Sequence, residues 1–215
     1  MNTIDDVLNL LVSHGAAMYG GEAVTQLEHA LQCATLAEES DASAALIGAC
    51  LLHDLGHLIE RDFTQRTDFG VDDLHQYIAI PFLRSIFGEA LLAPIRMHVD
   101  AKRYLCFSNP DYWATLTPLS QQSLTLQGGI FSASEAAAFI NQPFAKDAVQ
   151  LRQWDDRAKS PDQATRRIEH FAPVLWTCAL RDRRRDSVHE ADTPLFDRRI
   201  DLQIRQATSE TENGV

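Results

Sequence analysis

The sequence lacks the features that typify secreted, membrane and nucleic-acid-binding proteins. Cysteine is scarce: the 215 residues include four, and none belongs to a CxxC pair, which indicates reduced thiols rather than a disulfide framework. No apolar run has the length of a membrane span, and the first residues are acidic where a secretory signal needs positive charge. The formal net charge of −11 disfavours binding to phosphate backbones. We therefore expect a cytoplasmic protein, monomeric or a small homo-oligomer, without a membrane or nucleic-acid partner.

Strand signals and internal repeats are also scarce, whereas helical periodicity extends along most of the chain. The only short alternating stretch lies at 123–126. The segment 44–59 is apolar almost all round, which is typical of the central helix of a bundle. We predict an all-α fold, with one domain over 1–182 and a charged C-terminal extension over 183–215. Besides a first helix that Thr3 caps and that ends near Gly15, the expected helices cover about 25–39, 44–59, 74–87, 88–104, 132–139, 144–158 and 164–181.

The motif that carries chemistry is His53-Asp54-Leu55-Gly56-His57, at the end of this apolar segment. Burying an unpaired carboxylate is costly, so Asp54 needs a strong partner, and a metal ion is the simplest one. His57 lies four residues after His53, hence on the same face of a helix. Taken alone, the His-Asp pair is equally compatible with an ordinary buried hydrogen bond.

Other histidines and a carboxylate make the metal interpretation stronger. His29 shares a helix face with Cys33, His75 begins a predicted helix, and His98 and Asp155 lie on two later ones. Neutral imidazoles combined with carboxylates suit borderline metals such as iron, manganese or zinc. We therefore expect these side chains to converge on His53 and Asp54.

The order His29, His53-Asp54, Asp155 resembles the HD-domain superfamily, whose fold is a helical bundle around a metal. His75 and His98 match the members that hold two metals. The resemblance implies that His29, His53 and Asp155 hold one ion and that Asp54, His75 and His98 hold the other. In those members the Asp of the His-Asp pair bridges both ions.

Within the superfamily, residues 17–160 resemble the small branch of phosphonate-cleaving oxygenases with a mixed-valent Fe(II)/Fe(III) centre. The matching segments are Tyr19-Gly20-Gly21-Glu22, Gln26-Leu27-Glu28-His29, His53-Asp54-Leu55-Gly56-His57, His98-Val99-Asp100-Ala101-Lys102, Leu124-Thr125-Leu126-Gln127-Gly128-Gly129 and Trp154-Asp155.

This resemblance implies dioxygen as cosubstrate, no external reductant, and cleavage of the carbon–phosphorus bond of a 1-hydroxy-2-aminoethylphosphonate. The products would be phosphate and glycine, or glycine betaine from the N-trimethylated substrate. The carboxylates of Asp72 and Asp73, near His75, favour the trimethylated form slightly.

An anionic substrate needs positive charge in the pocket. Lys102 lies one helical turn after His98, and Arg152 lies three residues before Asp155, so both are placed to reach the metal site. The resemblance further implies phosphonate contacts from Ser120 and Gln127 and a hydrogen bond from His57. Ser123 is an alternative to Ser120.

The resemblance also implies a gate at the cationic end of the substrate. Glu22 would face the amino or ammonium group, and Tyr19 would occupy the iron before substrate arrives. Lys159, four residues after Asp155, is a reserve candidate for the site. The rival functions are a metal-dependent phosphohydrolase on the same fold, an oxygenase of a polyol, and a non-catalytic metal-binding regulator.

Overall fold

A computed structural model of the chain describes residues 3–59 and 74–180, and its regular structure in these ranges is helical. Isolated bridges join Met18 to Thr25 and Phe87 to Ala179. The prediction of an all-α fold is therefore confirmed. The helices are α1 (Ile4–His14), α2 (Gln26–Glu39), α3 (Ala44–Leu52), α4 (Leu55–Ile59), α6 (His75–Leu83), α7 (Glu89–Ser108), α8 (Tyr112–Thr115), α9 (Pro118–Leu126), α10 (Ala133–Ile140), α11 (Ala145–Arg157) and α12 (Ile168–Cys178).

Local capping explains where the helices near the site begin. Thr25 accepts a hydrogen bond from Glu28 N, and the Glu28 carboxylate accepts one from Thr25 N, which closes a capping box at the start of α2. Thr117 caps α9 in the same position, with Pro118 in the first turn. The alternating stretch at 123–126 is therefore part of a helix and not a strand.

The prediction of one continuous helix over 44–59 was wrong. Helix α3 ends at Leu52 and α4 begins at Leu55, so the chain turns at His53-Asp54. The His53 ring nitrogen Nδ1 bonds to Cys50 O, and His57 N donates to Asp54 O. Side-chain and backbone bonds thus replace regular helical bonds at the turn. The turn places the two adjacent residues at the centre of the molecule.

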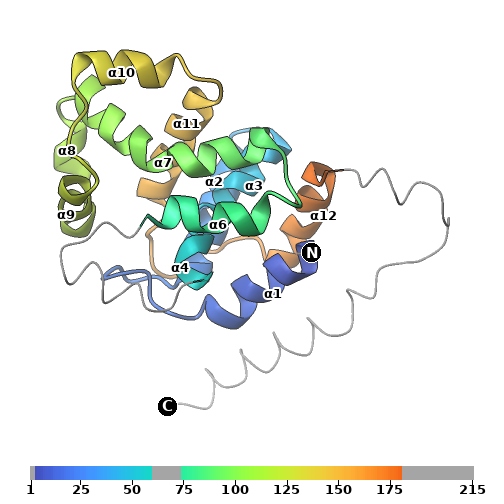
Figure 1. The fold of residues 1–215 in the computed structure, drawn as a ribbon. Coiled ribbons are helices and arrows are strands. Elements are labelled where there is room, and N and C mark those ends of the chain that lie inside the picture. The colour runs from blue at the N-terminus through green and yellow to red at the C-terminus, as the bar shows by residue number, and fades with distance from the viewer. Residues whose placement is uncertain (1–2, 60–73, 181–215) are drawn as a thin grey trace, which may run out of the picture.

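Helix α3 lies in the middle of the bundle, where it packs against α2, α7 and α12 (Figure 1). Its side chains Leu51 and Leu52 are almost completely buried. Helix α7, the longest of the helices described, packs along α11 as well as α3 and α6. Burying these apolar faces is the main source of stability for such a bundle.

Helices α8, α9 and α10 lie together at one end of α7 (Figure 1). They enclose smaller apolar clusters, one around Phe131 and Phe139 and one around Tyr112 and Leu124. Of the helices described, none is both long enough and apolar enough to cross a bilayer. The predicted extension over 183–215 lies outside the described residues, as do Asp72 and Asp73.

Candidate dinuclear metal site and its cavity

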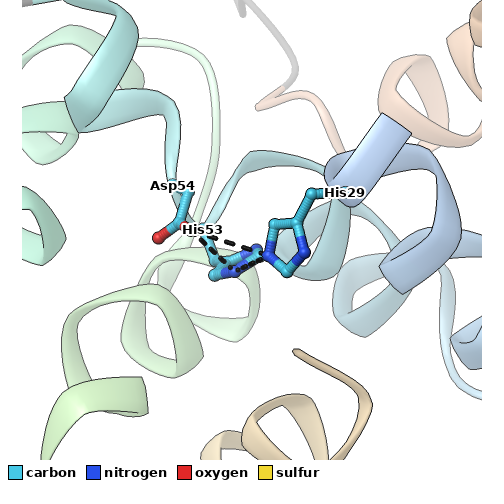
Figure 2. A group of neighbouring side chains, drawn as sticks. All are labelled: His29, His53 and Asp54. Atoms are coloured by element: carbon cyan, nitrogen blue, oxygen red, sulfur yellow. Dashed lines mark hydrogen bonds and ion pairs between the residues drawn. The ribbon is translucent and has the colours of Figure 1, made fainter. Parts of the chain in front are cut away.

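The side chains predicted to bind metal come from five places in the sequence and meet in the core. Helix α2 supplies one, the turn between α3 and α4 supplies two, and α6, α7 and α11 supply one each. Figure 2 shows how His29 and the adjacent His53 and Asp54 lie together. All of them are less than a tenth exposed: His29, His53, Asp54, His75, His98 and Asp155.

Two groups of ligand atoms share the Asp54 carboxylate. On one side, which we call the inner triad, are His29, His53 and Asp155. His29 Nε2 lies 3.2 Å from His53 Nε2 and 3.3 Å from Asp155 Oδ1. Asp54 Oδ2 lies 3.3 Å from His53 Nε2.

On the other side, which we call the outer pair, are His75 and His98. Their Nε2 atoms lie 3.0 Å apart. The second oxygen of the shared carboxylate, Asp54 Oδ1, lies 3.4 Å from His75 Nε2 and 3.7 Å from His98 Nε2. Each group therefore faces a different oxygen of Asp54, as expected for a bridging carboxylate.

Backbone carbonyl oxygens fix the orientation of three of these imidazoles. A carbonyl oxygen only accepts hydrogen bonds, so each Nδ1 carries a proton and, in a neutral ring, Nε2 carries the lone pair. Metal-binding histidines are typically held in this way. The bonds join His29 Nδ1 to Ala158 O at 2.7 Å, His53 Nδ1 to Cys50 O at 2.9 Å and His98 Nδ1 to Ile95 O at 2.7 Å.

The cluster fits two cations better than it fits hydrogen bonding alone. Among the described residues, the buried atoms Asp54 Oδ2 and Asp155 Oδ1 have no hydrogen-bond partner. Two ligand atoms that each lie about 2.1 Å from one ion, at right angles, are about 3 Å apart. The observed separations of neighbouring ligand atoms, 3.0 to 3.9 Å, are close to this size. Four imidazoles and two carboxylates suit iron, manganese or zinc.

The electrostatics of the cluster favour a cation. Burial alone would raise the pKa of Asp54, but the positive charge of His53 and His75 holds it well below its usual value. Burial likewise opposes charge on His53, yet Asp54 outweighs burial and raises its pKa to about 10. The Asp54 carboxylate thus remains ionised, and its negative charge favours a cation beside it.

Gly56 explains why the outer pair can lie so close to Asp54. A Cβ atom at Gly56 would lie 2.2 Å from His75 O and 3.0 Å from His75 Cα. The absence of a side chain therefore lets α4 contact the first residue of α6 directly. Stacking of the His57 and His75 rings, with centroids 4.3 Å apart, adds to this contact.

A cavity of about 600 Å³ opens beside the cluster. Asp54, His75, His98 and Asp155 line it. The substrate-contact residues expected from the sequence line the same cavity: Tyr19, Glu22, His57, Lys102, Ser120, Gln127 and Arg152.

Lys102 is the more buried of the two lysines that line the cavity, with 2% exposure. Its Nζ donates to Ser123 Oγ at 2.7 Å. Burial, assisted by the charge of Arg152, lowers the pKa of Lys102 to about 7. Both Ser120 and Ser123 line the cavity, but the hydroxyl that contacts Lys102 belongs to Ser123.

Arg152 forms ion pairs with the metal-ligand candidate Asp155 and with its neighbour Asp156. Its Nη1 lies 2.7 Å from Asp155 Oδ2, and its Nη2 pairs with Asp156. Tyr112, from α8, donates to Asp156 and accepts from Arg152 Nε at 3.3 Å. Although burial would raise the pKa of Asp155, Arg152 holds it well below its usual value. Arg152 thus orients one ligand while the same side chain borders the cavity.

Tyr19 and Glu22 lie on the loop between α1 and α2. The Tyr19 ring stacks on the His29 ring, with centroids 3.9 Å apart and planes at 12°. Burial, followed by the charges of Asp54 and Asp155, raises the pKa of the Tyr19 hydroxyl well above its usual value. The Glu22 carboxylate faces Lys159, whose Nζ lies 4.0 Å from Glu22 Oε1.

Comparisons with known proteins agree with this geometry. The HD domain family model matches residues 27–126. The chain is 44% identical over 176 residues to the hydroxymethylphosphonate dioxygenase of Gimesia maris, covering 81% of this chain and 87% of that one. It is 35% identical over 174 residues to the glycine-betaine-forming [1-hydroxy-2-(trimethylamino)ethyl]phosphonate dioxygenase of Leisingera caerulea, covering 81% and 89%. An uncharacterized protein of Acanthamoeba polyphaga mimivirus is 33% identical over 178 residues, covering 81% of each chain.

The chain belongs to the HD-domain phosphonate dioxygenases. It is an oxygenase built on an HD domain, as the sequence motifs predicted, and its His/Asp cluster has the form of a dinuclear metal site. The rival assignment to a non-catalytic regulator is thereby set aside.

In this HD-domain dioxygenase, every residue that the sequence proposed for the site lies in the His/Asp cluster or lines its cavity. The roles of those residues stay predictions. Sequence reasoning missed how several of them are held. Nothing in the sequence indicated that Tyr112 holds Arg152, because Tyr112 lies forty residues from it on a four-residue helix. The pairing of Arg152 with Asp156, four residues later on α11, could have been found from helical spacing. Lys159 could be found only from its spacing to Asp155.

Proposed function

We propose that this enzyme uses dioxygen to cleave the carbon–phosphorus bond of a 1-hydroxyalkylphosphonate, releasing inorganic phosphate. The observation that carries the proposal is the joint position of two features in one cavity. One is the His/Asp cluster that shares Asp54, and the other is the buried ammonium of Lys102. Both named dioxygenase relatives act on phosphonates according to their names.

Each half of the cluster would hold one iron, in the Fe(II)/Fe(III) state that the family resemblance implies. Iron supplies dioxygen binding and one-electron chemistry when bound. The imidazoles with fixed Nε2 atoms and the Asp54 carboxylate would hold the ions in place. Asp155 is kept ionised and oriented by Arg152, so it is ready to bind the inner ion.

The polar side chains that line the cavity beside the ligands would bind and orient the phosphonate. The Lys102 ammonium compensates part of its charge, and the Ser123 hydroxyl positions that ammonium. Gln127 Oε1 is buried and has no partner among the described residues, so it is free to accept a hydrogen bond from a substrate hydroxyl. Such fixed contacts would place the C1 carbon beside the metal centre.

The substituent on C1 is the finer question. The family resemblance implies an aminoethyl substituent facing Glu22, with a slight preference for the trimethylated form. That preference depends on Asp72 and Asp73, which lie outside the described residues. The named relatives differ in this respect, one being named for a hydroxymethyl and one for a trimethylaminoethyl substrate.

The test is an oxygen balance. Protein loaded with iron and brought to the Fe(II)/Fe(III) state should consume dioxygen and release phosphate in equal amounts from a 1-hydroxyalkylphosphonate. A metal-dependent phosphohydrolase would instead release phosphate from a phosphate monoester under argon. Phosphate release that continues without oxygen would therefore overturn the proposal.

The matched variants are Lys102→Met and Arg103→Met, two basic residues of α7. Lys102 borders the cavity, whereas Arg103 pairs with Asp100 and the carbonyl of Gly129. We expect the first variant to lose phosphonate turnover, with a large rise in KM, and the second to keep it.

A further inference from the structure

The cavity contains a second lysine whose partner changes the expected role of Glu22. Lys159 Nζ lies 4.0 Å from Glu22 Oε1, and the two side chains are 10% and 19% exposed. An ion pair with so little solvent is screened weakly, so the two opposite charges attract each other. The carboxylate that the sequence assigns to a substrate cation already faces a cation of the protein.

The backbone around Lys159 is held on both sides. Before it, Ala158 O accepts the bond from His29 Nδ1 at 2.7 Å. After it, Ser160 N donates to Gln32 Oε1 at 3.1 Å, and Gln32 Nε2 donates back to Ser160 O at 2.8 Å. Gln32 is 1% exposed, so this pair of hydrogen bonds is a fixed part of the core. The backbone of Lys159 is therefore fixed beside the metal ligands, and its side chain starts from a defined position.

The side chain of Lys159 extends from there into the substrate cavity. Its Nζ lies 5.6 Å from the centre of the Tyr19 ring, a distance at which a cation is attracted by an aromatic face. Lys159 lines the same cavity as Lys102 and Asp155. The ion pair with Glu22 and the contact with Tyr19 thus place its charge at the end of the cavity formed by the Tyr19–Glu22 loop.

We propose that Lys159 is a specificity-determining residue, which neutralises Glu22 and makes this end of the cavity reject a cationic substituent. The enzyme would then select 1-hydroxyalkylphosphonates with an uncharged group on C1, of which hydroxymethylphosphonate is the smallest. This inference rests on the proposed function and departs from the expectation that Glu22 receives an ammonium group.

The charges explain the selection. An ammonium substituent that approached Glu22 would lie beside Lys159, and like charges at such separations repel strongly in a poorly solvated site. If it displaced Lys159, the lysine would lose its partner while still enclosed. An uncharged substituent meets neither cost. Discrimination would therefore come from a repulsive element as much as from an attractive one.

The test compares hydroxymethylphosphonate with 2-amino-1-hydroxyethylphosphonate in four proteins: the unmodified enzyme, Lys159→Met, Lys159→Arg and Glu22→Gln. We expect the unmodified enzyme to prefer hydroxymethylphosphonate in kcat/KM by at least about tenfold. Lys159→Met should reduce this preference at least about tenfold, mainly by lowering KM for the amino substrate. Lys159→Arg keeps the charge and should keep the preference, and Glu22→Gln should increase it.

Calorimetric titration without oxygen gives a readout that does not depend on turnover. The dissociation constants of the two phosphonates should show the same reversal between the unmodified enzyme and Lys159→Met. A preference for the amino substrate in the unmodified enzyme, or an unchanged ratio in Lys159→Met, would overturn the role of Lys159. Neither result would affect the proposed function, which fails only if no hydroxyphosphonate gives oxygen-dependent phosphate release.

Discussion

The two halves of the His/Asp cluster differ in charge and in access. The inner triad combines two imidazoles with Asp155 and one oxygen of Asp54, whereas the outer pair has two imidazoles and only the other oxygen of Asp54. His75 and His98 line the cavity, while the Tyr19 ring covers His29. The inner half thus offers more negative charge and less solvent, and the outer half offers more room.

This difference predicts unequal metal binding. Ligand charge and number raise the affinity of a site for cations, so the inner ion should be held more tightly. The outer ion, with fewer protein ligands and a cavity beside it, should exchange more readily and have more positions for other ligands. Asp54 links the halves, so the loss of its carboxylate should affect both.

The largest effect is therefore expected for Asp54→Asn. The amide keeps the shape of the side chain but removes the charge that both halves share, so iron content should fall from about two ions per chain toward zero. Oxygen consumption should become undetectable. Elemental analysis of protein loaded without oxygen measures the first result, and circular dichroism checks the fold. Asp100→Asn, on the outer side of α7, is the matched control and should keep its iron.

Single histidine variants sharpen the comparison. His98→Ala should lose the outer ion and keep about one iron per chain, whereas His29→Ala should weaken the tighter half and lower the total content further. Electron paramagnetic resonance distinguishes an isolated ion from a coupled pair. His170→Ala, which changes an exposed histidine bonded to Glu38, controls for loss of an imidazole. Equal losses in the two ligand variants would contradict the proposed inequality.

Gly56→Ala should produce a smaller, one-sided effect. The new methyl group would lie 2.2 Å from His75 O, so α6 must shift and take His75 away from Asp54. We expect a loss of about 1–3 kcal/mol in the free energy of unfolding and weaker binding of the outer ion only. Thermal unfolding and iron content measure these two results. In the control, Gly88→Ala, the nearest atom is at an ordinary contact distance of 3.6 Å.

The sequence predicted the inner and outer ligands more completely than it predicted their surroundings. Helical spacing relates Lys102 to His98 and Arg152 to Asp155, so local periodicity was sufficient for those pairs. The turn at His53-Asp54 could not be predicted, because the apolar segment around it has every local feature of a continuous helix. Contacts between distant segments, such as Glu22 with Lys159, depend on the packing of α11 against the rest of the bundle. No local pattern encodes them.

The mildest perturbation is a change of pH, which acts on the charge of Lys102 rather than on the metal ligands. Burial lowers the pKa of Lys102 to about 7, so its ammonium loses its proton as the pH rises through this value. The neutral amine attracts a phosphonate less, and kcat/KM should fall above the pKa by up to about tenfold per pH unit. Positive metal ions nearby would lower the pKa of Lys102 further, so this fall in kcat/KM would move to lower pH and never to higher. Lys102→Arg keeps its charge throughout the range and should flatten the limb, whereas an unchanged profile would assign the titration to another group.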